Sequence, residues 1–380
     1  MRQSRRGQVD PFIVMDVMEA ARRAEAAGRR IVHMEVGQPA TPAPAVARRA
    51  LAAALDQPLG YTVALGLPAL REAIAGLYRR WYGVELDPGR VVITAGSSGA
   101  FLLAFAALFE AGDRVAVGEP GYPSYRQILR AMSVEPVGMP TRFENRYQPL
   151  PADIPGDVQG VMLASPGNPS GTMLDHAALA ALAARAAEIG AALISDEIYH
   201  GLSYGARCVS ALEVTDDVVV INSFSKFFSM TGWRIGWMVV PPDLVRTMDR
   251  LAANMFICPP HASQVAALAA LSPEGEAEAQ ANLAVYAENR RLLLDRLPAI
   301  GFDRIAPPDG AFYLYADVSA LTDDSAALAA EILETAGVAV TPGIDFDPVR
   351  GRQTLRFSYA GATDEIALGL ERLAAWMAAR

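Results

Sequence analysis

Lysine is almost absent from this chain of 380 residues. Of the 33 lysine and arginine residues, only Lys226 is a lysine, and the other 32 are arginines. Arginine keeps its proton in proteins, whereas lysine loses it where the surroundings favour the free amine. A chain that uses arginine wherever positive charge is enough, and keeps one lysine, indicates a use for that amine. The alternative, a leftover surface charge, fits the count equally well.

Cysteine and histidine are also scarce, with two and four residues. Cys208 and Cys258 stand far apart and form no Cys-x-x-Cys pair. We therefore expect a reducing compartment and no disulfide framework. The four histidines are scattered without the spacing of metal ligands, so we predict no metal site.

The chain also lacks long apolar runs and an excess of positive charge. Its most apolar stretch, residues 100–109, is too short to span a bilayer and is predicted to be a buried helix. The basic N-terminus is not followed by the apolar core of a signal peptide. A formal net charge of −9 argues against a nucleic-acid binder. We therefore expect a cytoplasmic protein that binds neither nucleic acid nor a membrane.

The middle of the chain alternates between apolar β-type runs and helical segments. With 380 residues, of which 52% are hydrophobic, the chain is long enough to bury a large core and to form two domains. Strands are predicted at 91–94, 114–117, 134–138, 160–164, 192–195, 218–222 and 235–240. This alternation implies an α/β fold with a mostly parallel sheet covered by helices on both faces. Ligands of such sheets bind beyond the carboxyl ends of the strands.

The flanking regions are helical or mixed. Helical spacing predicts helices at 10–28, 44–55 and 68–82, and then from 242 to 297 with breaks near 259 and 272. A short strand is predicted at 31–36. The last part is α+β, with strands at 312–318, 338–341 and 354–359 and helices at 325–336 and 363–378.

Lys226 lies just after the buried strand predicted at 218–222. Lysine amines form Schiff bases with carbonyl compounds, pyridoxal phosphate (PLP) among them. Arg234, eight residues later, carries a planar fork that suits a phosphate. Ser223-x-x-Lys226 also fits the serine acyl-transfer pattern of β-lactamases and penicillin-binding proteins. That pattern needs a Lys-Thr-Gly as well, which a chain with one lysine cannot supply.

Polar or aromatic residues follow three more predicted strands. Ser97 and Ser98 lie in a Gly/Ser turn before a helix, where backbone N–H groups can bind an anion. Tyr122, in a Pro/Gly turn, is suited to stack on a planar ring. Asn168, between glycine and proline, offers an amide aimed by a rigid loop. Each also has an ordinary explanation as a turn or surface residue.

Two further charged residues stand at the end of a predicted strand or on one. Asp196 ends an apolar strand, where burial of a carboxylate is unfavourable unless it is paired. A pyridinium N–H is one such partner, and a helix N-cap role is the alternative. Tyr199, three residues later, can face the same way. Arg356 alternates with the apolar residues of its strand, and its fork suits a carboxylate; the alternative is a surface arginine on an edge strand.

Taken together, these features resemble the class I/II aminotransferases, the fold-type-I PLP enzymes, over nearly the whole chain. The matching segments are 37–39, 61–62, 66–74, 120–123, 166–171, 195–199, 223–226, 234–237 and 356–358. The resemblance implies a large PLP-binding domain at 46–284, with a mostly parallel seven-stranded sheet between helices. It also implies a smaller α+β domain formed by 1–45 and 285–380.

The resemblance further implies roles around the cofactor ring. Lys226 holds PLP as a Schiff base and then moves the proton between the substrate Cα and the cofactor. Asp196 keeps the pyridine nitrogen protonated, which makes the ring an electron sink. Tyr199 and Asn168 bind the ring 3′-oxygen by hydrogen bonds, and Tyr122 stacks on the ring.

The cofactor phosphate is assigned to a second group of residues by the same resemblance. Ser97, Ser98, Ser223 and Arg234 bind it from their own chain. Tyr61 reaches it from the neighbouring subunit, which implies a homodimer. The Ser-Ser-Gly phosphate loop is a variant without a diagnostic side chain.

For the substrate, the resemblance implies that Arg356 binds the α-carboxylate, helped by Asn168 and the backbone at Gly37. No arginine can be assigned to a side-chain carboxylate, so a dicarboxylate preference is not indicated. The predicted activity is ping-pong transfer of an amino group from an α-amino acid to a 2-oxo acid, in amino acid metabolism.

Three alternatives stand beside this prediction. A PLP lyase, such as a C–S lyase, or a PLP decarboxylase shares the fold and differs in what leaves Cα. The serine acyl-transfer reading lacks its other motifs. The third alternative is a non-enzymatic effector module of the same fold. Such a module is fused to a DNA-binding domain, and we expect no room for that domain in this chain.

Overall fold

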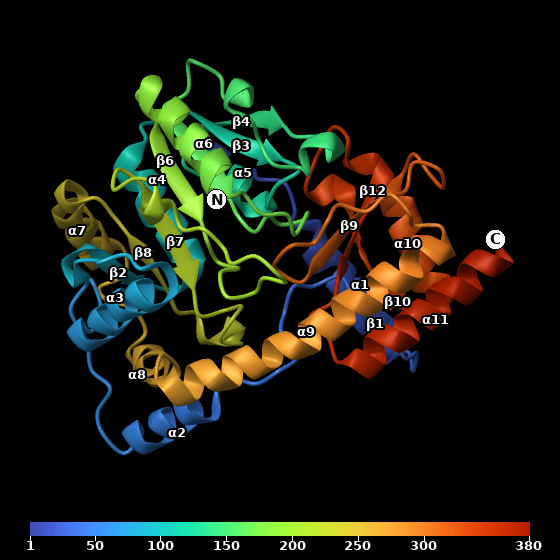
Figure 1. Ribbon diagram of the computed structural model, residues 1–380, viewed down its shortest axis with the longest axis horizontal. Helices are drawn as coiled ribbons and strands as arrows, with labels where there is room; N and C mark the ends of the chain where they lie inside the picture. The colour runs from blue at the N-terminus through green and yellow to red at the C-terminus, as the bar shows by residue number, and fades with distance from the viewer.

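Seven strands form the central sheet of the computed structural model, which describes residues 1–380 (Figure 1). Their order is β2-β8-β7-β6-β5-β3-β4, and only β8 runs antiparallel to its neighbours. The strands are β2 (Val91–Thr94), β3 (Arg114–Glu119), β4 (Glu135–Pro140), β5 (Gly160–Ala164), β6 (Ala192–Asp196), β7 (Val219–Ser223) and β8 (Gly236–Val239). The prediction of a mostly parallel seven-stranded sheet is confirmed.

Helices bury both faces of this sheet. Val115 and Val117 of β3 belong to one hydrophobic cluster, whereas Ala116 between them belongs to another. Apolar runs without polar alternation therefore form these strands, because neither face meets water. The surrounding helices are α3 (Pro68–Tyr82), α4 (Gly96–Leu108), α5 (Pro123–Ala131), α6 (His176–Glu188), α7 (Val245–Met255) and α8 (His261–Ala270). The stretch 100–109 lies in α4 except for Phe109, its C-cap, and is largely buried, as predicted.

A smaller α+β unit lies beside the large sheet. Its antiparallel sheet has the order β11 (Thr341–Pro342), β12 (Thr354–Ser358), β9 (Tyr313–Asp317), and β1 (Val32–His33) pairs in parallel with β10 (Val338–Ala339). The single strand predicted at 338–341 is thus two strands in two sheets. β12 is the central strand, so the alternative that placed Arg356 on an edge strand is wrong.

Long helices connect and cover the two parts. Figure 1 shows α9 (Pro273–Ile300) running from α8 and α2 (Ala45–Ala54) to the far end of the smaller unit. There it packs against α11 (Thr363–Ala379), which also contacts α10 (Ser325–Ala336). The N-terminal helix α1 (Ile13–Ala26) packs against β10 and β11. No helix combines the length and the apolar character that crossing a bilayer requires.

Candidate active site

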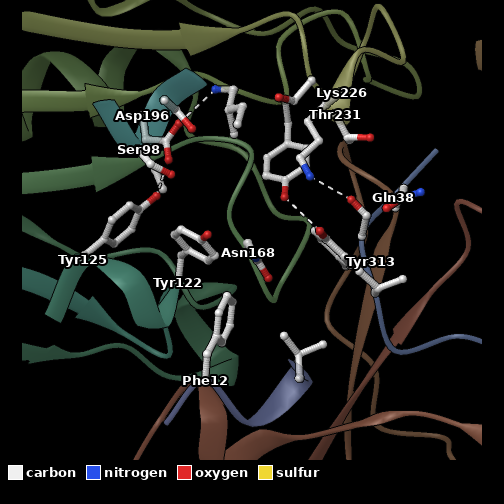
Figure 2. Close-up of a pocket in the computed structure, with 18 of the residues that line it drawn as sticks. Phe12, Gln38, Ser98, Tyr122, Tyr125, Asn168, Asp196, Lys226, Thr231 and Tyr313 are labelled. Atoms are coloured by element: carbon white, nitrogen blue, oxygen red, sulfur yellow. Dashed lines mark hydrogen bonds between the residues drawn. The ribbon is translucent and has the colours of Figure 1, made fainter. Parts of the chain in front are cut away.

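A cavity of about 220 Å³ lies where strand ends of the large sheet meet the smaller unit and the N-terminal segment. Figure 2 shows side chains from all three regions pointing into it, among them Lys226, Asp196, Asn168 and Tyr313. The structure therefore brings together residues that are up to about 340 positions apart in the chain. The predicted residues in its lining are Gly37, Ser97, Ser98, Tyr122, Asn168, Asp196, Tyr199, Lys226, Arg234 and Arg356.

Lys226 presents its amine to this cavity. Its Nζ donates a hydrogen bond to the carbonyl oxygen of Gly37 at 2.7 Å. Burial lowers the pKa of Lys226 to about 8, with the charges of Arg356 and Arg234 adding to the shift and Asp196 opposing it. The amine is thus easier to deprotonate than that of a surface lysine, which makes it a better nucleophile near neutral pH.

Asp196 ends β6 with its carboxylate buried. Oδ1 accepts the backbone N–H of Ile198 at 3.0 Å, and Oδ2 accepts the hydroxyl of Tyr125. No helix begins after Asp196, so the helix-cap alternative does not apply. Burial raises its pKa to about 6, although these two hydrogen bonds and Lys226 oppose the rise. A cationic ring nitrogen in the cavity would stabilise the charged carboxylate.

The start of α4 has the features of an anion site. No side chain caps this helix, whose first turn carries Ser97 and Ser98. A Cβ built at Gly96 would lie 2.5 Å from Nη2 of Arg234, so only glycine lets the guanidinium approach the helix start. Arg234 itself has a left-handed backbone with φ of 52°. Free N–H groups, the helix dipole and a guanidinium together suit a phosphate dianion.

Ser223 lies next to this site but does not line the cavity. It is buried, donates to the carbonyl of Ile235 at 3.0 Å, and is hydrogen-bonded to Ser225 Oγ at 2.8 Å. Ser225 and Thr231 line the cavity instead. The sequence reasoning overlooked both, although they stand beside Lys226 and before Arg234.

Arg356 is buried in the wall opposite the large sheet. Its Nη1 donates to Asn168 Oδ1 at 2.9 Å, and its Nη2 donates to the carbonyl of Glu35. The guanidinium carbon lies 4.3 Å from the ring centre of Tyr313 and 4.7 Å from that of Phe346. Nε has no protein partner. A buried, clamped guanidinium with a free donor suits a ligand carboxylate, and the surface-arginine alternative is wrong.

Four tyrosines line the cavity. Tyr122 lines the cavity, and Phe12 and Tyr125 pack edge-on against its ring at centroid distances of 5.8 and 5.3 Å. The hydroxyl of Tyr199 lies 2.9 Å from that of Tyr313. Sequence reasoning singled out neither Tyr125 nor Tyr313. Tyr125 follows Tyr122 by one helical turn, which was a usable signal.

The apolar wall of the cavity is formed by residues that were not singled out one by one from the sequence. It comes from Phe12, Val14 and Met15 near the start of α1 and from Val36 after β1. These residues carry no motif, and only the folded chain brings them to the site. Tyr61, by contrast, lies outside the cavity with a relative exposure of 83%.

Comparison with known proteins identifies the family of this chain. A sequence model of the family described as aminotransferase class I and II matches residues 29–373. The chain belongs to the class I and II aminotransferases.

Relatives and solved structures agree with this assignment. A valine–pyruvate aminotransferase of Mycobacterium tuberculosis is 50% identical over 98% of this chain and 97% of its own. A crystal structure from Silicibacter pomeroyi, whose assignment as an aminotransferase is provisional, is 68% identical with a TM-score of 0.95, covering all of both chains. An aspartate aminotransferase of Thermus thermophilus with maleate is 33% identical with a TM-score of 0.93, covering 99% of this chain and 100% of its own.

The protein is therefore an aminotransferase that moves an amino group from an amino acid to a 2-oxo acid, and its cofactor is PLP. The lyase alternative is not favoured. The residues present fit the cofactor: an amine, a buried carboxylate and an anion site at the start of α4 line one cavity.

Proposed function

We propose that this aminotransferase acts on a small branched apolar amino acid, with valine as the reference substrate and pyruvate as the acceptor. The observation that carries the proposal is the lining of the cavity. Its cations are Lys226, Arg234 and Arg356, and the remaining wall toward α1 is apolar. None of the three is free for a carboxylate on the substrate side chain. A relative 50% identical to this chain is named valine–pyruvate aminotransferase.

The proposed division of the chemistry follows from the position of each group. When bound, PLP supplies an electron sink that stabilises negative charge at the substrate Cα. Lys226 would hold the cofactor covalently and would move the proton at the substrate Cα. Asp196 keeps the ring nitrogen protonated through its charge. Tyr199 and Asn168 donate hydrogen bonds to the ring 3′-oxygen.

Orientation is assigned to the groups at the two ends of the cavity. Arg234, Ser97, Ser98 and the N–H groups at the start of α4 hold the phosphate, with Ser223 bracing Ser225 beneath them. Arg356 binds the substrate carboxylate and fixes Cα within reach of Lys226. Tyr122 stacks on the ring. Holding the reacting groups in position lowers the entropic part of the barrier to proton transfer.

Attachment of the cofactor can be tested at a single residue. Borohydride reduction of the enzyme, followed by peptide mass mapping, should place a pyridoxyl group on Lys226. No second lysine side chain competes, because the chain has none. A label at any other residue, or no label, would contradict the role proposed for Lys226.

Substrate preference is tested one half-reaction at a time. Valine, isoleucine, alanine, aspartate and glutamate are each mixed with the enzyme while the visible absorbance of the cofactor is followed. Valine should react at least about tenfold more efficiently than aspartate, since a buried unpaired carboxylate is strongly disfavoured. Pyruvate should then restore the absorbance faster than 2-oxoglutarate. A preference for aspartate would contradict the proposal.

A variant that adds a cation sharpens this test. Met15 lines the cavity, so Met15→Arg should raise the efficiency with aspartate relative to valine. Met18, one turn along α1, lines only a neighbouring surface cavity, so Met18→Arg is the matched control and should leave the ratio unchanged. An equal change in both variants would point to a general effect of charge.

We also propose that two copies of the chain assemble and share their active sites. Tyr61 and Val63 are exposed large apolar residues, as are Met255, Phe256 and Ile257. The two segments are tied together, because the N–H of Thr62 donates to Cys258 Sγ at 3.4 Å. Monomeric proteins seldom expose several such residues together. In a homodimer this surface is covered and Tyr61 reaches the phosphate of the partner.

Mixed dimers test the shared site. Tyr61→Phe should weaken PLP binding and Lys226→Ala should abolish turnover. In a mixed dimer one site carries both changes and the other carries neither. At PLP concentrations that leave Tyr61→Phe homodimers mostly empty, the mixture should therefore be more active than either parent. No gain, with subunit exchange confirmed by mass, would place Tyr61 outside the site.

The domain division is proposed on similar grounds. Residues 46–284 hold the seven-stranded sheet, and residues 1–45 with 285–380 hold the two smaller sheets. The upper boundary falls within α9, which runs through both parts. Limited proteolysis that cuts only in loops near residue 45 would support the lower boundary, whereas cleavage mainly inside residues 46–284 or 285–380 would contradict the division.

A further inference from the structure

Tyr313 touches three parts of the site at once. This residue of β9 is buried, and its hydroxyl lies 2.9 Å from that of Tyr199. Its ring centre lies 4.3 Å from the guanidinium carbon of Arg356. A Cβ built at Gly37, whose carbonyl accepts Lys226, would lie 1.6 Å from the Tyr313 hydroxyl. Figure 2 shows Tyr313 on the same side of the cavity as Lys226, with its hydroxyl near the Lys226 amine.

The direction of the tyrosine–tyrosine hydrogen bond follows from the role of Tyr199. Either hydroxyl can donate in the pair taken alone. When Tyr199 gives its single proton to the cofactor 3′-oxygen, its own oxygen can only accept from Tyr313. Burial raises the pKa of Tyr313 while Arg356 opposes the rise, so the hydroxyl keeps its proton at neutral pH. Successive hydrogen bonds of this kind strengthen each other.

We propose that Tyr313 is a positioning residue that couples the cofactor side of the site to the carboxylate-binding arginine. Its hydroxyl donates to Tyr199 and makes Tyr199 a stronger donor to the cofactor oxygen. Its ring supports the guanidinium of Arg356 through a cation–π contact. The inference rests on the roles proposed above for Tyr199 and Arg356.

The same strand supplies a matched control. Tyr315, two residues along β9, is as buried as Tyr313, with both at 2% relative exposure. Its hydroxyl is bonded to Thr354 Oγ1 at 2.6 Å and does not line the active-site cavity. Loss of a buried tyrosine hydroxyl can therefore be compared at two positions of one strand, only one of which faces the cofactor.

The hydroxyl is tested by the pH titration of the visible band of the bound cofactor. A hydrogen bond to the 3′-oxygen stabilises its negative charge and favours the deprotonated form of the nitrogen that links Lys226 to the ring. Tyr313→Phe should therefore raise the titration midpoint by about 0.5 pH unit, as expected for one lost hydrogen bond. The charged groups facing the two hydroxyls, Lys226, Asp196 and Arg356, stay in place in this variant.

Two reference variants make the result decisive. Tyr199→Phe should raise the midpoint more than Tyr313→Phe, and Tyr315→Phe should leave it unchanged. A shift in Tyr199→Phe but none in Tyr313→Phe would overturn the inference and leave the role of Tyr199 intact. No shift in either would remove the role of Tyr199 and the inference with it. Equal shifts in Tyr313→Phe and Tyr315→Phe would reduce Tyr313 to a structural residue.

The ring is tested by carboxylate affinity. The dissociation constant of 3-methylbutanoate, an unreactive monocarboxylate, is measured by spectral titration. Tyr313→Phe keeps the ring and should bind it normally, whereas Tyr313→Leu should bind it about three- to tenfold more weakly. Tyr313→Met replaces the leucine variant if that variant does not fold. Equal affinity in the phenylalanine and aliphatic variants would overturn the coupling to Arg356.

Discussion

The two sides of the cavity differ in chemistry and in their origin along the chain. The side formed by the large sheet is polar, and its residues, such as Asp196 and Lys226, stand at or just after strand ends. The side formed by the smaller unit and the N-terminus is mostly apolar and has one buried charge, Arg356. The first side holds groups that any substrate needs. On the second side, Arg356 is proposed to bind the α-carboxylate that all amino acids share, and the apolar wall to contact the side chain, which differs between them.

The two sides are also held in different ways. Asp196 is fixed by its own strand and by Tyr125 nearby. The apolar wall depends on a distant residue, because α1 has no capping side chain of its own. The carboxylate of Asp345 accepts the N–H groups of Ile13 and Val14 at 3.1 and 3.2 Å instead. Substitutions in the apolar wall should therefore change substrate preference while the chemical step is kept. Substitutions on the sheet side should not change the chemical step so separately from the rest of the site.

The largest expected effect lies on the sheet side. Asp196→Asn keeps the size of the side chain but loses the charge that is proposed to keep the ring nitrogen protonated. Cofactor should still bind, while the rate of Cα proton removal should fall about a hundredfold or more. Single-turnover kinetics with valine measure that rate. Near-normal turnover would mean that Asp196 only closes its local turn.

A smaller effect is expected at the one charge of the other side. Arg356→Lys keeps the charge but loses the planar fork of the guanidinium and its contacts with the rings of Tyr313 and Phe346. KM should rise about tenfold to a hundredfold for every amino acid, with a weaker effect on kcat. Steady-state kinetics with valine and alanine provide the measurement. An unchanged KM for both would exclude Arg356 from substrate binding.

The cap of α1 should have a selective effect. Asp345→Ala removes both acceptors and should lower the free energy of unfolding by about 1 kcal/mol. It should also raise KM a few-fold for valine and less for alanine, because the wall around the side chain loosens. Asp324→Ala is the control, since Asp324 caps α10 away from the cavity. A similar KM change in both variants would separate Asp345 from substrate preference.

The smallest effect concerns the pH dependence of stability near the wall. A hydrogen bond to Glu35 raises the pKa of His33 to about 9, against the effect of burial, and Glu25 contributes on the other ring nitrogen. A raised folded-state pKa stabilises the fold fully below the unfolded value, and this stability is lost as pH rises through about 9. The imidazole is partly exposed, so the expected loss is about 1 kcal/mol or less.

Denaturant unfolding at pH 6 and at pH 10 measures this contribution. The wild-type protein should lose more stability between the two values than His33→Gln, which cannot titrate. Where both proteins are folded, they should turn over substrate at the same rate, because His33 lies away from the groups on the sheet side. An identical pH dependence in both proteins would show that the pKa of His33 does not change on unfolding.

The sheet side was largely predictable because local sequence and local structure coincide there. Apolar β-branched runs form strands buried on both faces. A polar residue at the end of such a run therefore usually lies at the ligand site, where it can find a polar partner. Lys226 stood out by its rarity alone. Ser223 illustrates the limit: alternation cannot tell which of two nearby hydroxyls, Ser223 or Ser225, faces the cavity.

The other side was less predictable because its contacts are long-range. The predicted strand at 338–341 divides between two sheets, and pairing partners, not the segment itself, decide where it breaks. Tyr313 reads as one more aromatic residue in an apolar strand, and nothing local distinguishes it from Tyr315. Their different surroundings arise only when β9 packs beside Tyr199 and Arg356.

The sequence by itself determined the helices and strands of the large sheet, the polar residues at their ends and the resemblance to a family. These follow from residue spacing and from the unfavourable burial of unpaired charge. Tertiary structure alone decided which residues far apart in the chain form the apolar wall, how Asp345 caps α1 and which tyrosine of β9 meets the site. Those outcomes depend on packing between segments about 300 residues apart, and short-range patterns carry no record of that packing.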